Sequence, residues 1–184
     1  MIVILGHTAA GKTTLAAHVA KALGAAVVSA DSRQVYRGMS IGTGKDLADY
    51  VVDGYEVPYY LVDIVDAGEK YNVFQFQKDF YDVYDRLHAE GKEVVLCGGT
   101  GMYLESVLRS YQMLQVPVNE DLRKELEGKS LAELEQLLTE YRTMHNTSDV
   151  DTAKRAIRAI EIAEYQKEHE IEMQAREIPA KVFK

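Results

Sequence analysis

The chain has 184 residues, of which 47% are hydrophobic, and its 21 Lys and Arg against 29 Asp and Glu give a net charge of -8. Such a chain can form one ordinary core without metal or disulfide cross-links, and the lone Cys97 excludes an internal disulfide, which favours the cytoplasm. The acidic balance excludes a protein that binds nucleic acid over its whole surface, so any RNA contact needs a local basic patch.

Strand and helix signals alternate through the first 112 residues. The run 2–5 has no basic segment before it and meets a glycine at once, a pattern that suits a buried strand better than a signal peptide. The strand candidates are residues 2–5, 25–29, 55–65 (interrupted by Pro58) and 93–97, and the helix candidates are 12–23, 73–87 and the segment after 101. This alternation predicts an α/β fold, a parallel sheet flanked by helices.

The character changes near Asn119, where leucines recur among charged residues without a strand candidate before Lys181. Residues 151–169 read as a long amphipathic helix with Arg155 and Arg158 on one side, either pairing with Glu161 or Glu164 or contacting a ligand. We therefore expect one P-loop core over residues 1–184, with an α/β phosphate-binding part (1–112) and a mainly helical part (113–184).

Between the first strand and the first helix lies a match to G-x-x-x-x-G-K-[ST]. In this motif the glycines let successive N–H groups face one anion, the helix N-terminus and Lys12 add positive charge, and the Thr13 hydroxyl can bind Mg²⁺. NTPases, small-molecule kinases and transferases with a diphosphate leaving group all use such a cradle. The phosphate-binding residues are Gly6, His7, Thr8, Ala9, Ala10, Gly11, Lys12 and Thr13.

Two further polar segments follow strands and should reach the same edge of the sheet. Asp31 follows the second strand and can take a proton or hold Mg²⁺ through water, or it can form an ordinary Asx turn. Ser32, Arg33 and Gln34 offer donors beside it. After the strand at 93–97 comes Gly-Gly-Thr-Gly, where Thr100 can donate to phosphate, although such glycines are often purely structural.

These motifs together resemble the tRNA dimethylallyltransferase (isopentenyltransferase) family in order and spacing. The resemblance rests on GHTAAGKTTLA, SADSRQVYRGMSIGTGK, VDIVDAGEKYNVFQF, VVLCGGTGMYLESVL and KRAIRAIEI. It implies a P-loop NTPase-like fold and transfer of a dimethylallyl group from its diphosphate, held with Mg²⁺, to N6 of an adenine beside the anticodon of tRNA. No apolar stretch of the sequence approaches the length of a membrane span, so we expect no membrane contact, and we infer no stable protein partner.

The resemblance also assigns roles to residues of this sequence. Asp31 would be the general base, with Lys12 and Thr100 acting on the leaving diphosphate. The residues that would contact the tRNA acceptor are Asp31, Ser32, Arg33, Gln34, Thr100, Arg123 and Arg158.

Several positions depart from the family pattern. His7 and Ala10 stand where proline and serine are usual, and Tyr59 and Tyr60 stand where histidines are usual. The family continues past Lys184 with a further core strand, an arginine that helps to hold the diphosphate, and tRNA-binding helices. We expect the chain to end before these elements, with Ala180 to Phe183 able to begin the strand. Three alternatives stay open: an adenylate isopentenyltransferase acting on AMP, ADP or ATP, a P-loop small-molecule kinase, and a binding module without activity.

Overall fold

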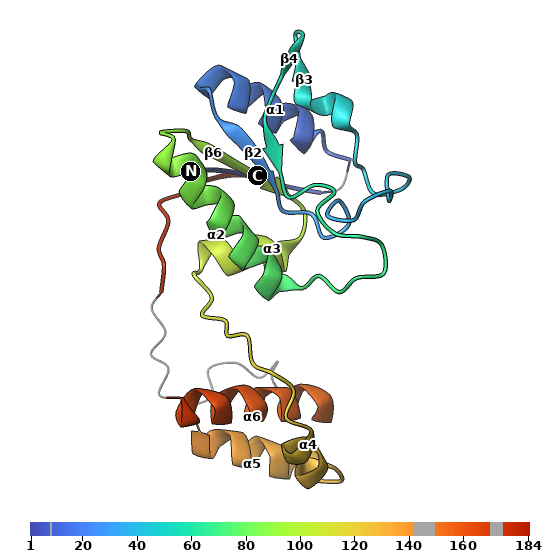
Figure 1. Cartoon of the computed structure of the whole chain (residues 1–184), viewed down its shortest axis with the longest axis vertical. Coiled ribbons are helices and arrows are strands. Elements are labelled where there is room, and N and C mark those ends of the chain that lie inside the picture. The colour runs from blue at the N-terminus through green and yellow to red at the C-terminus, as the bar shows by residue number, and fades with distance from the viewer. Residues whose placement is uncertain (8, 142–149, 170–174) are drawn as a thin grey trace. The chain divides into compact units, whose positions relative to one another are not determined.

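The computed structural model describes residues 1–7, 9–141, 150–169 and 175–184 (Figure 1). The chain forms two compact units, which we call unit 1 (Met1–Tyr111 with Ala175–Lys184) and unit 2 (Gln112–Gln174). The boundary at Tyr111 lies within one residue of the expected one. The expected helical part, 113–184, differs from unit 2 because the last ten residues return to unit 1.

Unit 1 is built on a five-stranded sheet in the order β5-β2-β6-β1-β7. All four neighbouring pairs are parallel, so the carboxyl ends of the strands lie at one edge. The strands are β1 (Ile2–Leu5), β2 (Ala26–Ser29), β5 (Tyr59–Tyr60), β6 (Val94–Gly98) and β7 (Lys181–Phe183).

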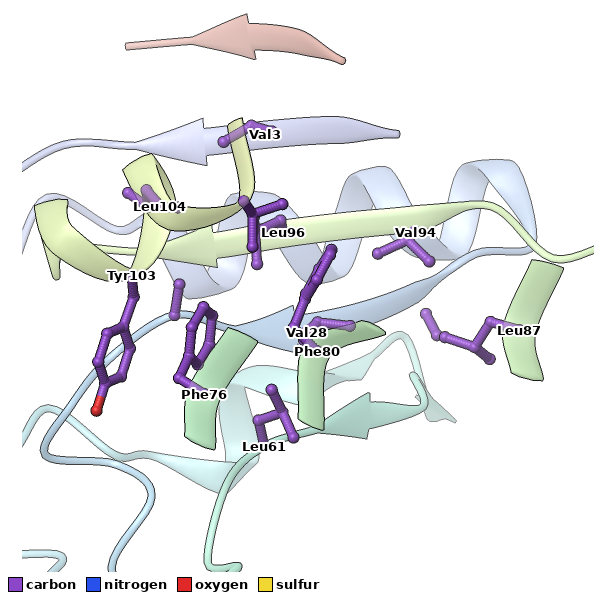
Figure 2. Packing of buried hydrophobic residues seen from close by; sticks show 13 residues of the cluster. Val3, Val28, Leu61, Phe76, Phe80, Leu87, Val94, Leu96, Tyr103 and Leu104 are labelled. Carbon is purple, nitrogen blue, oxygen red and sulfur yellow. The ribbon is translucent and has the colours of Figure 1, made fainter. Parts of the chain in front are cut away.

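Helices cover both faces of this sheet, as the alternating pattern predicts. On one face, α1 (Lys12–Leu23) packs with the 3₁₀ helix η1 (Leu47–Tyr50) and the hairpin of β3 (Val51–Val52) and β4 (Tyr55–Glu56). On the other, α2 (Val73–Ala89) and α3 (Gly101–Leu108) pack against side chains that alternate with those of the first face. Figure 2 shows Phe76 and Phe80 of α2 and Tyr103 of α3 against Val28 and Leu96 of the strands.

One segment differs in part from the sequence prediction. The strand-like stretch at 55–65, expected with an interruption at Pro58, forms β4 before the proline and β5 after it, and only β5 joins the main sheet. Leu61 and Asp63 beyond it take positive φ angles of 61° and 54°, which no strand tolerates. The further core strand, which we expected Ala180 to Phe183 to begin, is present as Lys181–Phe183, because these residues form β7 beside β1.

Unit 2 contains α4 (Glu120–Leu126), α5 (Leu131–Tyr141) and α6 (Ala153–Glu168), so its described part is helical as expected. Leucines of α4 and α5 pack against the apolar face of α6, where Ala156, Ala159, Ile160 and Ala163 recur at helical spacing. The Thr152 side chain caps α6 by accepting a hydrogen bond from the Arg155 amide. Buried leucines and this cap account for a small helical core within unit 2.

Candidate active site at the carboxyl edge of the sheet

The P-loop connects β1 to α1 and presents an open helix N-terminus. Gly11 precedes the helix with a left-handed φ of 69°, and no side chain caps the first turn, which also carries no acidic residue. The first amides of α1 are therefore directed toward an anion, which the helix dipole favours. The Lys12 ammonium donates to the carbonyl of His7, and Thr8 lies outside the described residues.

A cavity of about 160 Å³ opens beside this loop. From the P-loop it is lined by Ala9, Ala10, Gly11, Lys12 and Thr13. Asp31 and Gln34 line it from the segment after β2, and Gly98 and Gly99 from the end of β6. The structure thus brings the predicted phosphate cradle and the predicted base into one cavity.

Asp31 forms the Asx turn that was one of the two alternatives, and its side chain also reaches the cavity. Its Oδ1 accepts a hydrogen bond of 2.9 Å from the Arg33 amide, which is an Asx turn, and the same side chain lines the cavity. The next residue is fixed from the other loop: the Ser32 amide donates to Thr100 Oγ1 at 2.9 Å, and that hydroxyl donates to Ser32 Oγ at 3.2 Å. The turn and the Thr100 contact hold this segment in one conformation, while the Arg33 side chain is exposed.

The first glycine of the Gly-Gly-Thr-Gly segment, Gly98, is required by close packing. A Cβ at this position would lie 2.2 Å from the carbonyl oxygen of Ala30, so no other residue fits without moving the backbone. The Thr100 amide donates to the same carbonyl at 3.2 Å. Close packing of β6 against Ala30 is thus what requires glycine here, and it places both strand-end loops side by side.

Gln34 lines the cavity, but its amide is bound within the protein. Ser29 Oγ donates to Gln34 Oε1 at 3.1 Å, and Gln34 Nε2 donates to the carbonyl of Gly44 at 3.2 Å. Gln34, which we expected to contact the acceptor nucleotide, therefore also holds the loop that contains Gly44.

Among the lining residues that were not predicted as site residues are Thr43, Gly44, Asp49 and Tyr50. The first two lie in an Ile-Gly-Thr-Gly-Lys stretch, where glycines on both sides of a buried threonine were an available signal of a tight loop. Asp49 Oδ1 accepts a hydrogen bond from Thr14 Oγ1 at 3.1 Å, a contact across 35 residues that no local pattern reveals.

The thiol and the phenol near Asp31 are neutral at physiological pH. Burial raises the pKa of the Cys97 thiol to about 11, with Lys12 opposing and Asp31 adding to the effect. Burial, with Tyr36 and Asp31, raises the pKa of Tyr103 to about 12. The cavity lining also holds one basic side chain, Lys12, and the carboxyl groups of Asp31 and Asp49, an arrangement that suits a phosphate compound and a proton acceptor together.

Arg123 and Arg158 lie in unit 2 and share one partner there. The Glu161 carboxylate accepts bonds from Arg123 Nε at 2.8 Å, Arg123 Nη2 at 3.0 Å and Arg158 Nη1 at 3.0 Å, and also from the Asn119 amide at 3.0 Å. Arg155 pairs with Asp151 at 2.8 Å and not with Glu161 or Glu164. The two predicted RNA-contacting arginines are thus held by a carboxylate that sequence reasoning had assigned only to Arg155 or Arg158.

Two kinds of feature are absent from the described part of the chain. No helix in it is long and apolar enough to cross a membrane. No group of three or more His, Cys, Asp or Glu side chains in the same residues could hold a metal ion.

Comparison with known proteins gives a consistent result. A family model for IPP transferases matches residues 34–183. The tRNA dimethylallyltransferase 2 of Phocaeicola vulgatus is 60% identical over 179 residues, covering 97% of this chain and 58% of that protein. The tRNA dimethylallyltransferase 1 of Parabacteroides distasonis is 58% identical over 167 residues, 91% of this chain and 54% of that protein. The chain thus spans little more than half the length of these relatives.

Solved structures agree with the fold. The full-length tRNA isopentenylpyrophosphate transferase of Bacillus halodurans is 34% identical with a TM-score of 0.57, covering 89% of this chain and 55% of that one. A eukaryotic dimethylallyltransferase acting on tRNA has a TM-score of 0.65 over 99% of this chain and 47% of its own, and at 19% identity it supports the fold alone.

Proposed function

The chain belongs to the IPP transferase family, and from this premise we propose that it transfers a dimethylallyl group from dimethylallyl diphosphate to N6 of an adenine in tRNA, next to the anticodon. The observation that carries the proposal is the joint presence of Lys12 and Asp31 in one cavity at the end of the sheet. A phosphate cradle beside a carboxylate fits a reaction in which a diphosphate leaves and a proton is removed. We place this activity in the cytoplasm.

The donor diphosphate would lie on the first amides of α1, with Lys12 neutralising the oxygen that leaves. Mg²⁺ fits this site, because Thr13 lines the cavity and its hydroxyl is a hard oxygen donor, to which waters and the diphosphate would add the remaining ligands. When bound, the cation supplies further charge neutralisation at the departing oxygens. The Thr100 hydroxyl would connect the leaving group to the acceptor segment, since it already binds Ser32.

The acceptor step needs a base because the N6 lone pair of adenine is delocalised into the ring. As N6 bonds to the allylic carbon, the carbon–oxygen bond breaks, its electron pair leaves with the diphosphate, and the N6 proton passes to Asp31. A positioned base of this kind contributes typically about 10² to 10⁴-fold. To reach the cavity the adenine must leave the base stack of the RNA, as in other enzymes that modify a base.

Contacts with the rest of the RNA are proposed for Arg33, Arg123 and Arg158. Arg33 is exposed beside Asp31, and the Arg123 and Arg158 side chains are 39% and 36% exposed while they bind Glu161. Each guanidinium can therefore still meet a phosphate. The acidic net charge of -8 favours one other acceptor, a mononucleotide such as AMP, which needs no such grip.

Substitution of Asp31 by asparagine tests the proposal. The asparagine side chain can keep the Asx turn but cannot take the proton, so we expect transfer to fall by about 10²-fold or more with donor affinity nearly unchanged. The measurements are single-turnover transfer and calorimetric binding of dimethylallyl diphosphate with Mg²⁺. Asp46→Asn is the matched control, because Asp46 makes a similar bond to the Ala48 amide outside the cavity. Equal transfer rates in the Asp31 and Asp46 variants would remove Asp31 as the base.

A further inference from the structure

One wall of the cavity is a loop that closes on itself. Thr43 and Gly44 line the cavity from this loop, and Gly42 and Gly44 on either side of Thr43 have left-handed φ angles of 75° and 68°. The buried Thr43 hydroxyl lies 2.8 Å from the Met39 carbonyl and 3.1 Å from the Ser40 carbonyl. These contacts fix the shape of the loop, but they do not tie it to the rest of unit 1.

Lys45, the residue after Gly44, connects this loop to the rest of unit 1. The Lys45 side chain is only 2% exposed, and its ammonium binds the Asp63 carboxylate and donates to the Tyr36 carbonyl at 2.7 Å. Gln34 reaches the same loop through the Gly44 carbonyl, and the Asp63 amide donates to the Gln34 carbonyl at 3.0 Å. We call Gln34, Gly44, Lys45 and Asp63 the Lys45 clamp.

Burying the Lys45 ammonium in order to hold a loop is energetically unfavourable by itself. Desolvation of a charge costs several kcal/mol, and an apolar side chain of similar size is often as stable at such a place. The ion pair restricts the position of the loop, because the ammonium and the carboxylate can move little without losing their contacts. The clamp connects the cavity wall to the segment that begins at Asp31, the proposed base.

We propose that Lys45 is a positioning residue of the transfer reaction: held by Asp63, it keeps the Thr43–Gly44 wall in place so that the acceptor adenine meets Asp31 correctly. This inference rests on the proposed function and deepens it, since it concerns the acceptor side of the same site. It also accounts for the bond from the Gln34 amide to the Gly44 carbonyl, because the Gln34 and Lys45 side chains then hold the same wall. The Lys12 ammonium bonds to the His7 carbonyl and to no member of the clamp, so we expect the phosphate cradle to keep its shape when the clamp is broken.

The first test is the backbone order of the wall, measured on this chain by ¹⁵N relaxation. We expect order parameters of Thr43 and Gly44 near about 0.85 in the unchanged protein and below about 0.6 in Lys45→Met, with β6 unaffected. Lys45→Arg keeps the charge and should restore order. Lys92→Met is the control, because Lys92 forms an exposed ion pair with Glu90. An ordered wall in Lys45→Met would overturn the clamp.

The second test separates positioning from stability. Lys45→Met should lower kcat and raise the acceptor KM, with kcat/KM down by about 10²-fold, the usual effect of a displacement of 1 Å at a reacting group. Donor affinity should stay within about threefold, since the phosphate cradle is intact. Asp63→Asn is a second variant if Lys45→Met does not fold, because asparagine tolerates the left-handed φ of 54° at this position.

The outcomes distinguish the two proposals. Transfer by the unchanged protein, together with unchanged kinetics in folded Lys45→Met and Asp63→Asn, would overturn the positioning role alone. Loss of thermal stability with normal kcat/KM in the folded protein would overturn that role as well, because a merely structural ion pair predicts it. Absence of transfer by the unchanged protein to any adenine acceptor would overturn the proposed function whatever the order of the wall.

Discussion

Replacement of Glu161 by glutamine should destabilise unit 2 strongly. The Glu161 side chain is 0% exposed and accepts four hydrogen bonds, three of them from the charged groups of Arg123 and Arg158. Breaking a buried ion pair costs about 3 to 5 kcal/mol, and bonds to charged groups contribute about 1.5 to 3 kcal/mol each. Both arginines are more than a third exposed, so water offsets part of the loss, and we expect about 3 kcal/mol.

The same residue should make unit 2 sensitive to acid. Burial acts to raise the pKa of Glu161, but the bonds from Arg123, Arg158 and the Asn119 amide outweigh burial and hold it below its ordinary value. A lowered pKa in the folded state gives stability that is present above the unfolded pKa of about 4.3 and is lost as pH falls through the folded value. Glu161→Gln should remove this loss.

Urea unfolding followed by hydrogen exchange of α6 amides, at pH 7 and at pH 3, measures both effects. Glu164→Gln is the matched control, because Glu164 lies one turn further on the same helix and makes one long contact, 3.5 Å, with the Tyr141 hydroxyl. A loss below about 1 kcal/mol in Glu161→Gln at pH 7, the size expected for a surface pair, would refute the reasoning.

Two further predictions concern the cavity. Lys12→Ala should weaken binding of dimethylallyl diphosphate by at least about tenfold in calorimetry, since a charge-assisted bond is lost, and unchanged affinity would remove the cradle assignment. Gly98→Ala should destabilise unit 1 by about 1 to 3 kcal/mol or more in thermal unfolding, because its Cβ would meet the Ala30 carbonyl, whereas Gly101→Ala has open space and should cost nothing. Equal melting temperatures for the two alanine variants would contradict this packing.

The sequence predicted those parts of the fold that local patterns determine. The P-loop match placed the turn between β1 and α1 correctly because a strand, a glycine-rich loop and a helix follow one another without interruption. The alternation of strand and helix signals along the chain likewise predicted the parallel sheet. Asp31 reached the cavity because parallel strands end at one edge, a rule that needs no knowledge of side-chain contacts.

The parts that sequence reasoning missed depend on contacts between distant residues. Glu161 lies three residues from Arg158 but 38 from Arg123, so only the first pairing was within reach of a helical pattern. The Lys45–Asp63 pair and the Asp49–Thr14 bond join residues 18 and 35 positions apart. The early end of β5 at Tyr60, short of the expected Val65, depends on left-handed backbone at Leu61 and Asp63, which the apolar pattern of this stretch did not indicate.

The central claim is that this cavity transfers a dimethylallyl group to an adenine of tRNA. The most direct measurement is the transfer of radiolabelled dimethylallyl groups, with Mg²⁺, to three acceptors in parallel: unmodified tRNA with adenine beside the anticodon, AMP and ATP. We predict label in tRNA alone, with transfer that weakens steeply as salt rises because the acceptor is a polyanion. Label in AMP or ATP alone, or release of phosphate from ATP that depends on a second substrate, would contradict the claim.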